Sequence, residues 1–82
     1  MKKFIYFSAP WYGPCRQFGP VMSRIAQSGI PVEKIDVDKA PQVAAAYTVK
    51  SIPTTVLTDE QGKEISRFVG VKSEQEIREI YG

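Results

Sequence analysis

Apolar positions follow two different periods along this chain, and each change of period predicts a boundary between elements. Residues 4–7 (Phe-Ile-Tyr-Phe) form a continuous run of bulky β-forming side chains, typical of a strand buried on both faces. From Pro14 onward the apolar residues recur at steps of three and four, which predicts an amphipathic helix over residues 14–28. Gly29 is expected to end this helix. The apolar face consists of Phe18, Val21, Met22, Ile25 and Ala26.

The next segments predict a second strand and a short second helix. Residues 30–37 form the strand, and a strand, helix, strand unit of this length implies a right-handed crossover and a parallel pair. Asp38 is placed to cap the helix that follows. Pro41 suits its first turn, where a missing N–H costs nothing.

The last third of the chain predicts a hairpin and a final helix. Residues 54–58 are rich in β-branched side chains, and residues 63–69 return as the partner strand after turn-forming residues. Ser73 followed three residues later by Glu76 is a capping box, which predicts a helix starting there.

The predicted order is therefore β-α-β-α-β-β-α, an α/β protein with a four-stranded mixed sheet flanked by helices on both faces. Its 82 residues, 43% of them apolar, are expected to form a single domain over residues 1–82. A domain of this size buries only about 60% of its unfolded surface, so we expect marginal stability.

Charge and composition exclude several classes of function. The 11 basic and 9 acidic residues are interspersed, which does not favour a nucleic-acid interface. No apolar stretch approaches the roughly 18 residues of a membrane span. Ser8 and Pro10 interrupt the apolar run after the N-terminal lysines, so we expect no signal peptide and a cytoplasmic protein. One cysteine and no histidine predict no internal disulfide, no metal site and no cofactor.

The segment between the first strand and the first helix is the one place where the residues suggest chemistry. Gly13 supplies backbone freedom at the change of period, and Pro14 fits the first helical turn. Cys15, the only cysteine, therefore lies in that first turn.

This segment, Trp11-Tyr12-Gly13-Pro14-Cys15, resembles the Trp-Cys-Gly-Pro-Cys active-site motif of the thioredoxin family, with Tyr12 in place of the first cysteine. The resemblance covers the whole chain and implies the thioredoxin fold without the family's usual additional N-terminal strand and helix. It also implies membership of a family of thiol-disulfide oxidoreductases. Further motifs that carry the resemblance are Phe18 and Pro20, residues 36–38, residues 51–54, and Val69 with Gly70.

The change at Tyr12 limits the chemistry. Dithiol exchange needs an attacking thiolate and a second thiol that resolves the mixed disulfide. A phenol has no sulfur to form or accept a disulfide, so Tyr12 cannot replace the attacking thiolate. An internal disulfide cycle is therefore excluded, and at most monothiol chemistry at Cys15 remains.

Two further positions bear on Cys15. The family usually has a buried aspartate where this chain has Tyr6, and Lys34 matches the lysine that neighbours that aspartate. The acid that would deprotonate Cys15 is therefore missing. The alternative for Lys34, which we favour, is a solvated charge near the end of the second strand. Two interpretations of Cys15 stay open: a small apolar core residue, or a thiol that forms mixed disulfides.

The resemblance also implies a shallow groove that binds an extended peptide by strand-like addition. The Ile52-Pro53 bond would be cis, which leaves the backbone of Ile52 free to pair with the peptide. Glycine at position 70 would let a partner's backbone approach closely. The implied peptide-binding residues are Trp11, Gly13, Pro14, Ile52, Pro53, Val69 and Gly70.

Three hypotheses follow for a chain that we expect to be a monomer. In the first, Cys15 forms mixed disulfides with glutathione or a protein thiol, and a thioredoxin-type reductase is a candidate partner. In the second, the chain is a non-catalytic module that binds a protein or peptide, and Cys15→Ala preserves binding. In the third, Tyr12 is a substitution in an otherwise active dithiol enzyme.

Overall fold

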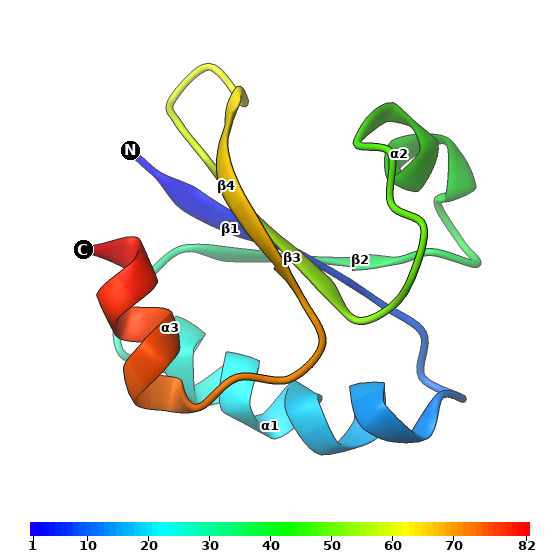
Figure 1. Cartoon of the computed structure of the whole chain (residues 1–82), viewed down its shortest axis with the longest axis horizontal. Helices are drawn as coiled ribbons and strands as arrows, with labels where there is room; N and C mark the ends of the chain where they lie inside the picture. The colour runs from blue at the N-terminus through cyan, green and yellow to red at the C-terminus, as the bar shows by residue number, and fades with distance from the viewer.

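The computed structural model describes residues 1–82 and contains four strands and three helices in the predicted order (Figure 1). The first half of the chain forms β1 (Lys3–Ser8), α1 (Gly13–Gln27) and β2 (Val32–Asp36). The second half forms α2 (Pro41–Ala46), β3 (Thr54–Thr58), β4 (Glu64–Val69) and α3 (Glu74–Tyr81).

The strands form one mixed sheet in the order β2-β1-β3-β4. β1 is parallel to β2, because α1 carries the chain back across the sheet between them. β1 is antiparallel to β3, and β3 is antiparallel to β4. The hairpin between β3 and β4 is closed by the Asp59 carboxylate, which accepts hydrogen bonds from the backbone N–H groups of Gln61 and Lys63, both at 2.9 Å. The predicted mixed sheet is confirmed.

Helices cover both faces of this sheet, and each face has its own apolar cluster. On the first face, α1 and α3 pack over the side chains of Phe4, Tyr6, Leu57 and Phe68. On the second face, the smaller helix α2 packs over Ile5, Phe7 and Val56. Alternate residues of β1 therefore point into different clusters, and the prediction that this strand is buried on both faces is confirmed.

Element boundaries differ from the predicted ones by one or two residues, and one cap was predicted wrongly. α1 begins at Gly13 and is followed by Gly29, whose φ of +102° is the left-handed conformation that favours glycine after a helix. α2 has Ala40 as its N-cap and no side-chain cap, so Asp38 does not cap it. The Asp38 carboxylate instead accepts a hydrogen bond from Trp11 Nε1.

The capping box of α3 is confirmed. Ser73 Oγ accepts a hydrogen bond from the Glu76 N–H, and Glu76 Oε1 accepts one from the Ser73 N–H, both at 3.1 Å. No helix combines the length and the apolar character that crossing a membrane would require.

Candidate functional site

Strand pairing brings three separate segments to one edge of the sheet. Phe7 at the end of β1 is opposite Thr54 at the start of β3, and Thr54 is opposite Val69 at the end of β4. The segment that leads from β1 to α1, the loop before β3 and the loop after β4 therefore all leave the sheet at this edge (Figure 1). All of the residues singled out by the sequence motif and the implied groove lie in these segments or beside them.

The turn between β1 and α1 places Tyr12 and Cys15 in different environments. Tyr12 is the N-cap of α1 with an extended backbone, and its N–H donates to the Ala9 carbonyl at 3.2 Å. Gly13 and Pro14 then open the helix, and the Arg16 N–H donates to the Tyr12 carbonyl at 3.1 Å. The side chain of Tyr12 remains 39% exposed, whereas Cys15 is only 4% exposed.

The titratable side chain that the structure places against Cys15 is the phenol of Tyr6. The Tyr6 hydroxyl donates a hydrogen bond to the Cys15 carbonyl at 3.3 Å. Burial raises the pKa of the Tyr6 phenol, an effect that the neighbouring Ser8 hydroxyl partly offsets. Tyr6 is therefore a neutral hydrogen-bond donor at physiological pH and cannot act as a base there.

Exposed apolar side chains lie in this turn and at the end of β4. Trp11 is 62% exposed, and its ring meets that of Tyr12 edge to face at 5.8 Å between centroids. On the end of β4 and just after it, Val69 and Val71 are 61% and 55% exposed. We call these four residues, Trp11, Tyr12, Val69 and Val71, the edge surface. Large apolar side chains exposed together are typical of contact sites.

The loop before β3 leaves backbone groups unused at this edge. The Ile52–Pro53 peptide bond is cis, and neither the N–H nor the C=O of Ile52 forms a hydrogen bond within the chain. The Pro53 carbonyl accepts a hydrogen bond from the Gly70 N–H at 2.8 Å, which joins this loop to the end of β4. Gly70 has a φ of +87°, and the space where its side chain would lie is empty within 4 Å.

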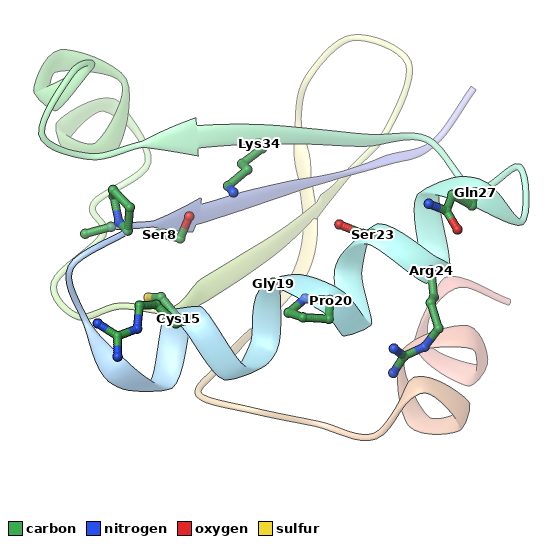
Figure 2. A pocket seen from close by; sticks show the side chains of 11 residues that line it. Ser8, Cys15, Gly19, Pro20, Ser23, Arg24, Gln27 and Lys34 are labelled. Carbon is green, nitrogen blue, oxygen red and sulfur yellow. The ribbon is translucent and has the colours of Figure 1, made fainter.

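A second feature, not predicted from the sequence, is a cleft of about 640 Å³ between α1 and the strands β1 and β2 (Figure 2). We call it the α1–β2 cleft. Cys15 lies on its wall, together with Ser8 from β1, Lys34 from β2 and Arg16 from α1. Arg16 and Lys34 are far apart in the sequence, and only the crossover of α1 brings them to one cleft.

The contact between Trp11 and Asp38 was also missed, although the sequence held a signal for it. Parallel strands joined by a crossover end at the same edge of a sheet. The residues after β1 and after β2 must therefore be neighbours, and the Val37 N–H donates to the Ser8 carbonyl at 3.0 Å. An acidic residue just past the second strand was thus well placed to meet the indole N–H of a tryptophan just past the first.

Comparison with known proteins identifies the family. The family model described as Thioredoxin matches residues 2–81. Thioredoxin from Chlamydia trachomatis is 39% identical over 75 residues, which cover 89% of this chain and 72% of that protein. Thioredoxin H2 from Arabidopsis thaliana is 42% identical over 71 residues, which cover 84% of this chain and 53% of that protein.

The solved structures agree with the sequence comparison. A mutant thioredoxin from Halobacterium salinarum superposes with a TM-score of 0.90 at 33% identity, covering 98% of this chain and 71% of that one. The four-stranded mixed sheet and its three helices thus superpose on a thioredoxin structure along nearly the whole length of this chain. The chain belongs to the thioredoxin family.

Proposed function

We propose that this chain is a thioredoxin-fold module that binds an extended peptide segment of a partner protein and does not catalyse dithiol exchange. The observation that carries this proposal is a contrast in exposure. The apolar side chains of the edge surface are open to solvent, whereas the single thiol is 4% exposed. The side chains that would contact a partner are therefore accessible, whereas the only thiol is nearly buried.

The absence of dithiol exchange follows from atom types. Cys15 is the only cysteine, so no second thiol can resolve a mixed disulfide within the chain. The exposed position at the start of α1 carries the Tyr12 phenol, which can contact a partner but cannot exchange sulfur. What remains at this edge is a binding surface.

Peptide binding is supported by the unused backbone groups beside the edge surface. The free N–H and C=O of Ile52 offer one donor and one acceptor to an extended chain, in the manner of an added strand. The missing side chain at Gly70 leaves room for a partner's backbone. Trp11 and Val69 then provide apolar surface for the peptide's side chains. Gly13 and Pro14 shape the turn that presents Trp11 and Tyr12.

One observation favours a second candidate function, monothiol chemistry at Cys15. Although this residue is nearly buried, it lies on the wall of the α1–β2 cleft. In this function the Cys15 thiolate attacks one sulfur of a disulfide such as oxidised glutathione. A mixed disulfide forms, the original S–S bond breaks and the other half leaves as a thiol. A second thiol from outside the chain is then needed to release the bound half.

The peptide-binding proposal can be tested with a displayed library of short unstructured peptides. Trp11 is the only tryptophan and lies in the edge surface, so its fluorescence reports peptide binding directly. We expect Val69→Asp to weaken a selected peptide by about tenfold, because it removes roughly 1.5 kcal/mol of apolar burial. Ile65→Asp is the matched control, since Ile65 lies on the same strand, is 51% exposed and is outside the edge surface.

Cys15→Ala separates the two functions, because peptide binding through the edge surface does not use sulfur. Unchanged affinity in Cys15→Ala, with loss in Val69→Asp and not in Ile65→Asp, is the expected result. Equal losses in the two aspartate variants would contradict a site at the edge surface. Loss of peptide binding in a folded Cys15→Ala variant would instead favour capture through the thiol.

A further inference from the structure

We infer that the α1–β2 cleft is a binding site for small anionic disulfides, which reach Cys15 through it and not from the edge surface. This inference deepens the second function proposed above, monothiol chemistry, and is independent of peptide binding. None of the residues that line the cleft belongs to the edge surface, and neither Ile52, Pro53 nor Gly70 lines it. Cys15 does line it, so a small molecule bound in the cleft lies beside this nearly buried residue.

The charge of the cleft selects anions. Three cationic residues line it, Arg16, Arg24 and Lys34, and no aspartate or glutamate does. Arg24 shares its charge with Glu74, whose carboxylate lies at 2.9 Å from Arg24 Nε. Arg16 and Lys34 form no ion pair within the chain. Two uncompensated cations beside one small cleft raise the local concentration of anions.

The neutral polar side chains of the cleft suit carboxylate and sulfonate groups. In Figure 2 the Lys34 ammonium and the Ser23 hydroxyl point into the space between α1 and β2. Ser8 from β1 and Gln27 from the end of α1 also line the cleft and add donors for oxyanions. A volume of about 640 Å³ accommodates a molecule of a few dozen atoms, whereas a folded partner protein could not enter.

The reaction expected in the cleft is a single thiol-disulfide exchange. Cys15 releases its proton to solvent, and the thiolate attacks the nearer sulfur of the bound disulfide. One S–S bond forms to Cys15 and the original S–S bond breaks. The departing thiolate is protonated by solvent. Cys15 is thereby oxidised and one half of the disulfide is reduced.

The test uses two colour-forming disulfides of similar size, the dianionic dithiobis(nitrobenzoate) and the neutral dithiodipyridine. The rate constant for Cys15 is measured with each reagent in the folded protein and in urea, and the ratio of the anionic to the neutral rate is compared. We expect the ratio to be about tenfold higher in the folded protein than in the unfolded one, because two uncompensated cations each contribute about threefold at a separation of roughly 6 Å in a water-like medium.

Charge variants locate the effect. Lys34→Gln and Arg16→Gln should each lower the folded-state ratio by about threefold. Lys63→Gln is the matched control, because Lys63 is exposed, forms no ion pair and lies outside the cleft, and it should leave the ratio unchanged. All variants are first checked for an unchanged unfolding midpoint in urea.

The other possible results contradict either the cleft alone or the cleft together with the monothiol function. Two outcomes would overturn the anion-selective cleft and leave monothiol chemistry standing. One is a fast reaction with both reagents but an equal rate ratio in folded and unfolded protein. The other is an equal effect of Lys34→Gln and Lys63→Gln on this ratio. No reaction with either reagent before unfolding would overturn both the cleft and the monothiol function. Neither result affects the peptide-binding assay, which is read from Trp11.

Discussion

The turn between β1 and α1 contributes residues to both the edge surface and the α1–β2 cleft, and the two regions differ in exposure, polarity and charge. The edge surface is exposed and apolar, with Trp11 and Val69 more than half exposed. The cleft is hollow and polar, and it carries Arg16 and Lys34 without a compensating carboxylate. The first favours contact with a partner's apolar side chains, and the second favours small anions.

The difference comes from where each side chain lies at the start of α1. Tyr12, as the N-cap, still has the extended backbone of the incoming chain, and its ring faces solvent beside Trp11. Cys15, three residues later, is in the first helical turn and is buried, and the Tyr6 hydroxyl donates to its backbone carbonyl. In a motif with two cysteines these two positions would share one reaction. Here they belong to two different surfaces.

The largest expected effect comes from Phe18→Ala, which should damage both surfaces together. Phe18 lies on the buried face of α1, with its ring centroid 5.7 Å from that of Tyr6 and 6.2 Å from that of Phe68. Removing it should lower the free energy of unfolding by about 3–5 kcal/mol, a large share of the stability of so small a domain. Urea denaturation measures this loss.

The matched control for Phe18→Ala is Gln17→Ala, the exposed neighbour on the same helix, which should change the free energy of unfolding by less than about 0.5 kcal/mol. The expectation would be contradicted if folded Phe18→Ala lost only peptide binding or only the Cys15 reaction. In that case, only one of the two surfaces would depend on the packing of α1.

Tyr12→Cys would move sulfur chemistry onto the edge surface. The variant has two thiols three residues apart at the start of α1, the spacing that dithiol exchange uses. We expect it to gain catalysed reduction of insulin disulfides by dithiothreitol, which the unchanged chain should lack. Tyr12→Ser provides the control, because it also removes the phenol but adds no sulfur. A Tyr12→Cys variant without activity would exclude the hypothesis that this chain is a substituted dithiol enzyme.

Gly70→Ala should affect the edge surface and spare the cleft. Any side chain at the φ of +87° is strained, and the expected cost in the free energy of unfolding is about 1–2 kcal/mol. The added methyl group also occupies the space proposed for the peptide backbone, so binding should weaken while the rate of the Cys15 reaction in the folded state is unchanged. Thermal unfolding, Trp11 fluorescence and thiol release measure the three effects.

Gly13→Ala is the counterpart of Gly70→Ala, because it adds the same methyl group at an ordinary φ with no atom within 4 Å. It should leave stability nearly unchanged. Equal destabilisation by the two substitutions would argue against backbone strain as the cause at Gly70.

The smallest expected effect is that of Ser73→Ala, which should lower stability and leave both surfaces intact. Loss of the cap of α3 should cost about 1 kcal/mol in the free energy of unfolding. The variant should also lose part of its acid sensitivity. Hydrogen bonds from the backbone and side chain of Ser73 hold the pKa of Glu76 below its ordinary value of 4.5.

The sign of this acid effect follows from the lowered pKa. A carboxyl whose pKa is lower in the folded state stabilises the fold above its ordinary pKa, and this stabilisation is lost as the pH falls through the folded value. Stability measured by urea denaturation at descending pH should therefore fall less steeply below pH 4.5 in Ser73→Ala than in the unchanged chain. Ser66→Ala, an exposed serine that caps no helix, should reproduce the original slope.

Local patterns in the sequence determined the elements and their order. The period of the apolar residues separates β1 from α1, and the continuous run at residues 4–7 predicts a strand with apolar clusters on both faces. The capping box at Ser73 and Glu76 is a contact over three residues, so the sequence alone could predict it. The limit on dithiol chemistry also came from the sequence, since it depends only on which atoms are present.

The tertiary structure decided everything that depends on residues far apart in the chain. Asp38 was expected to cap α2, yet it binds Trp11, because the parallel pairing of β1 and β2 places the two segments side by side. Arg16 and Lys34 meet at one cleft only through the crossover of α1. Whether Cys15 faces the core, the cleft or the edge surface depends on how α1 packs on the sheet. Residue types and spacing determine local conformation. The exposure and charge of a site depend on neighbouring residues that are far apart in the sequence, and only folding brings those residues together.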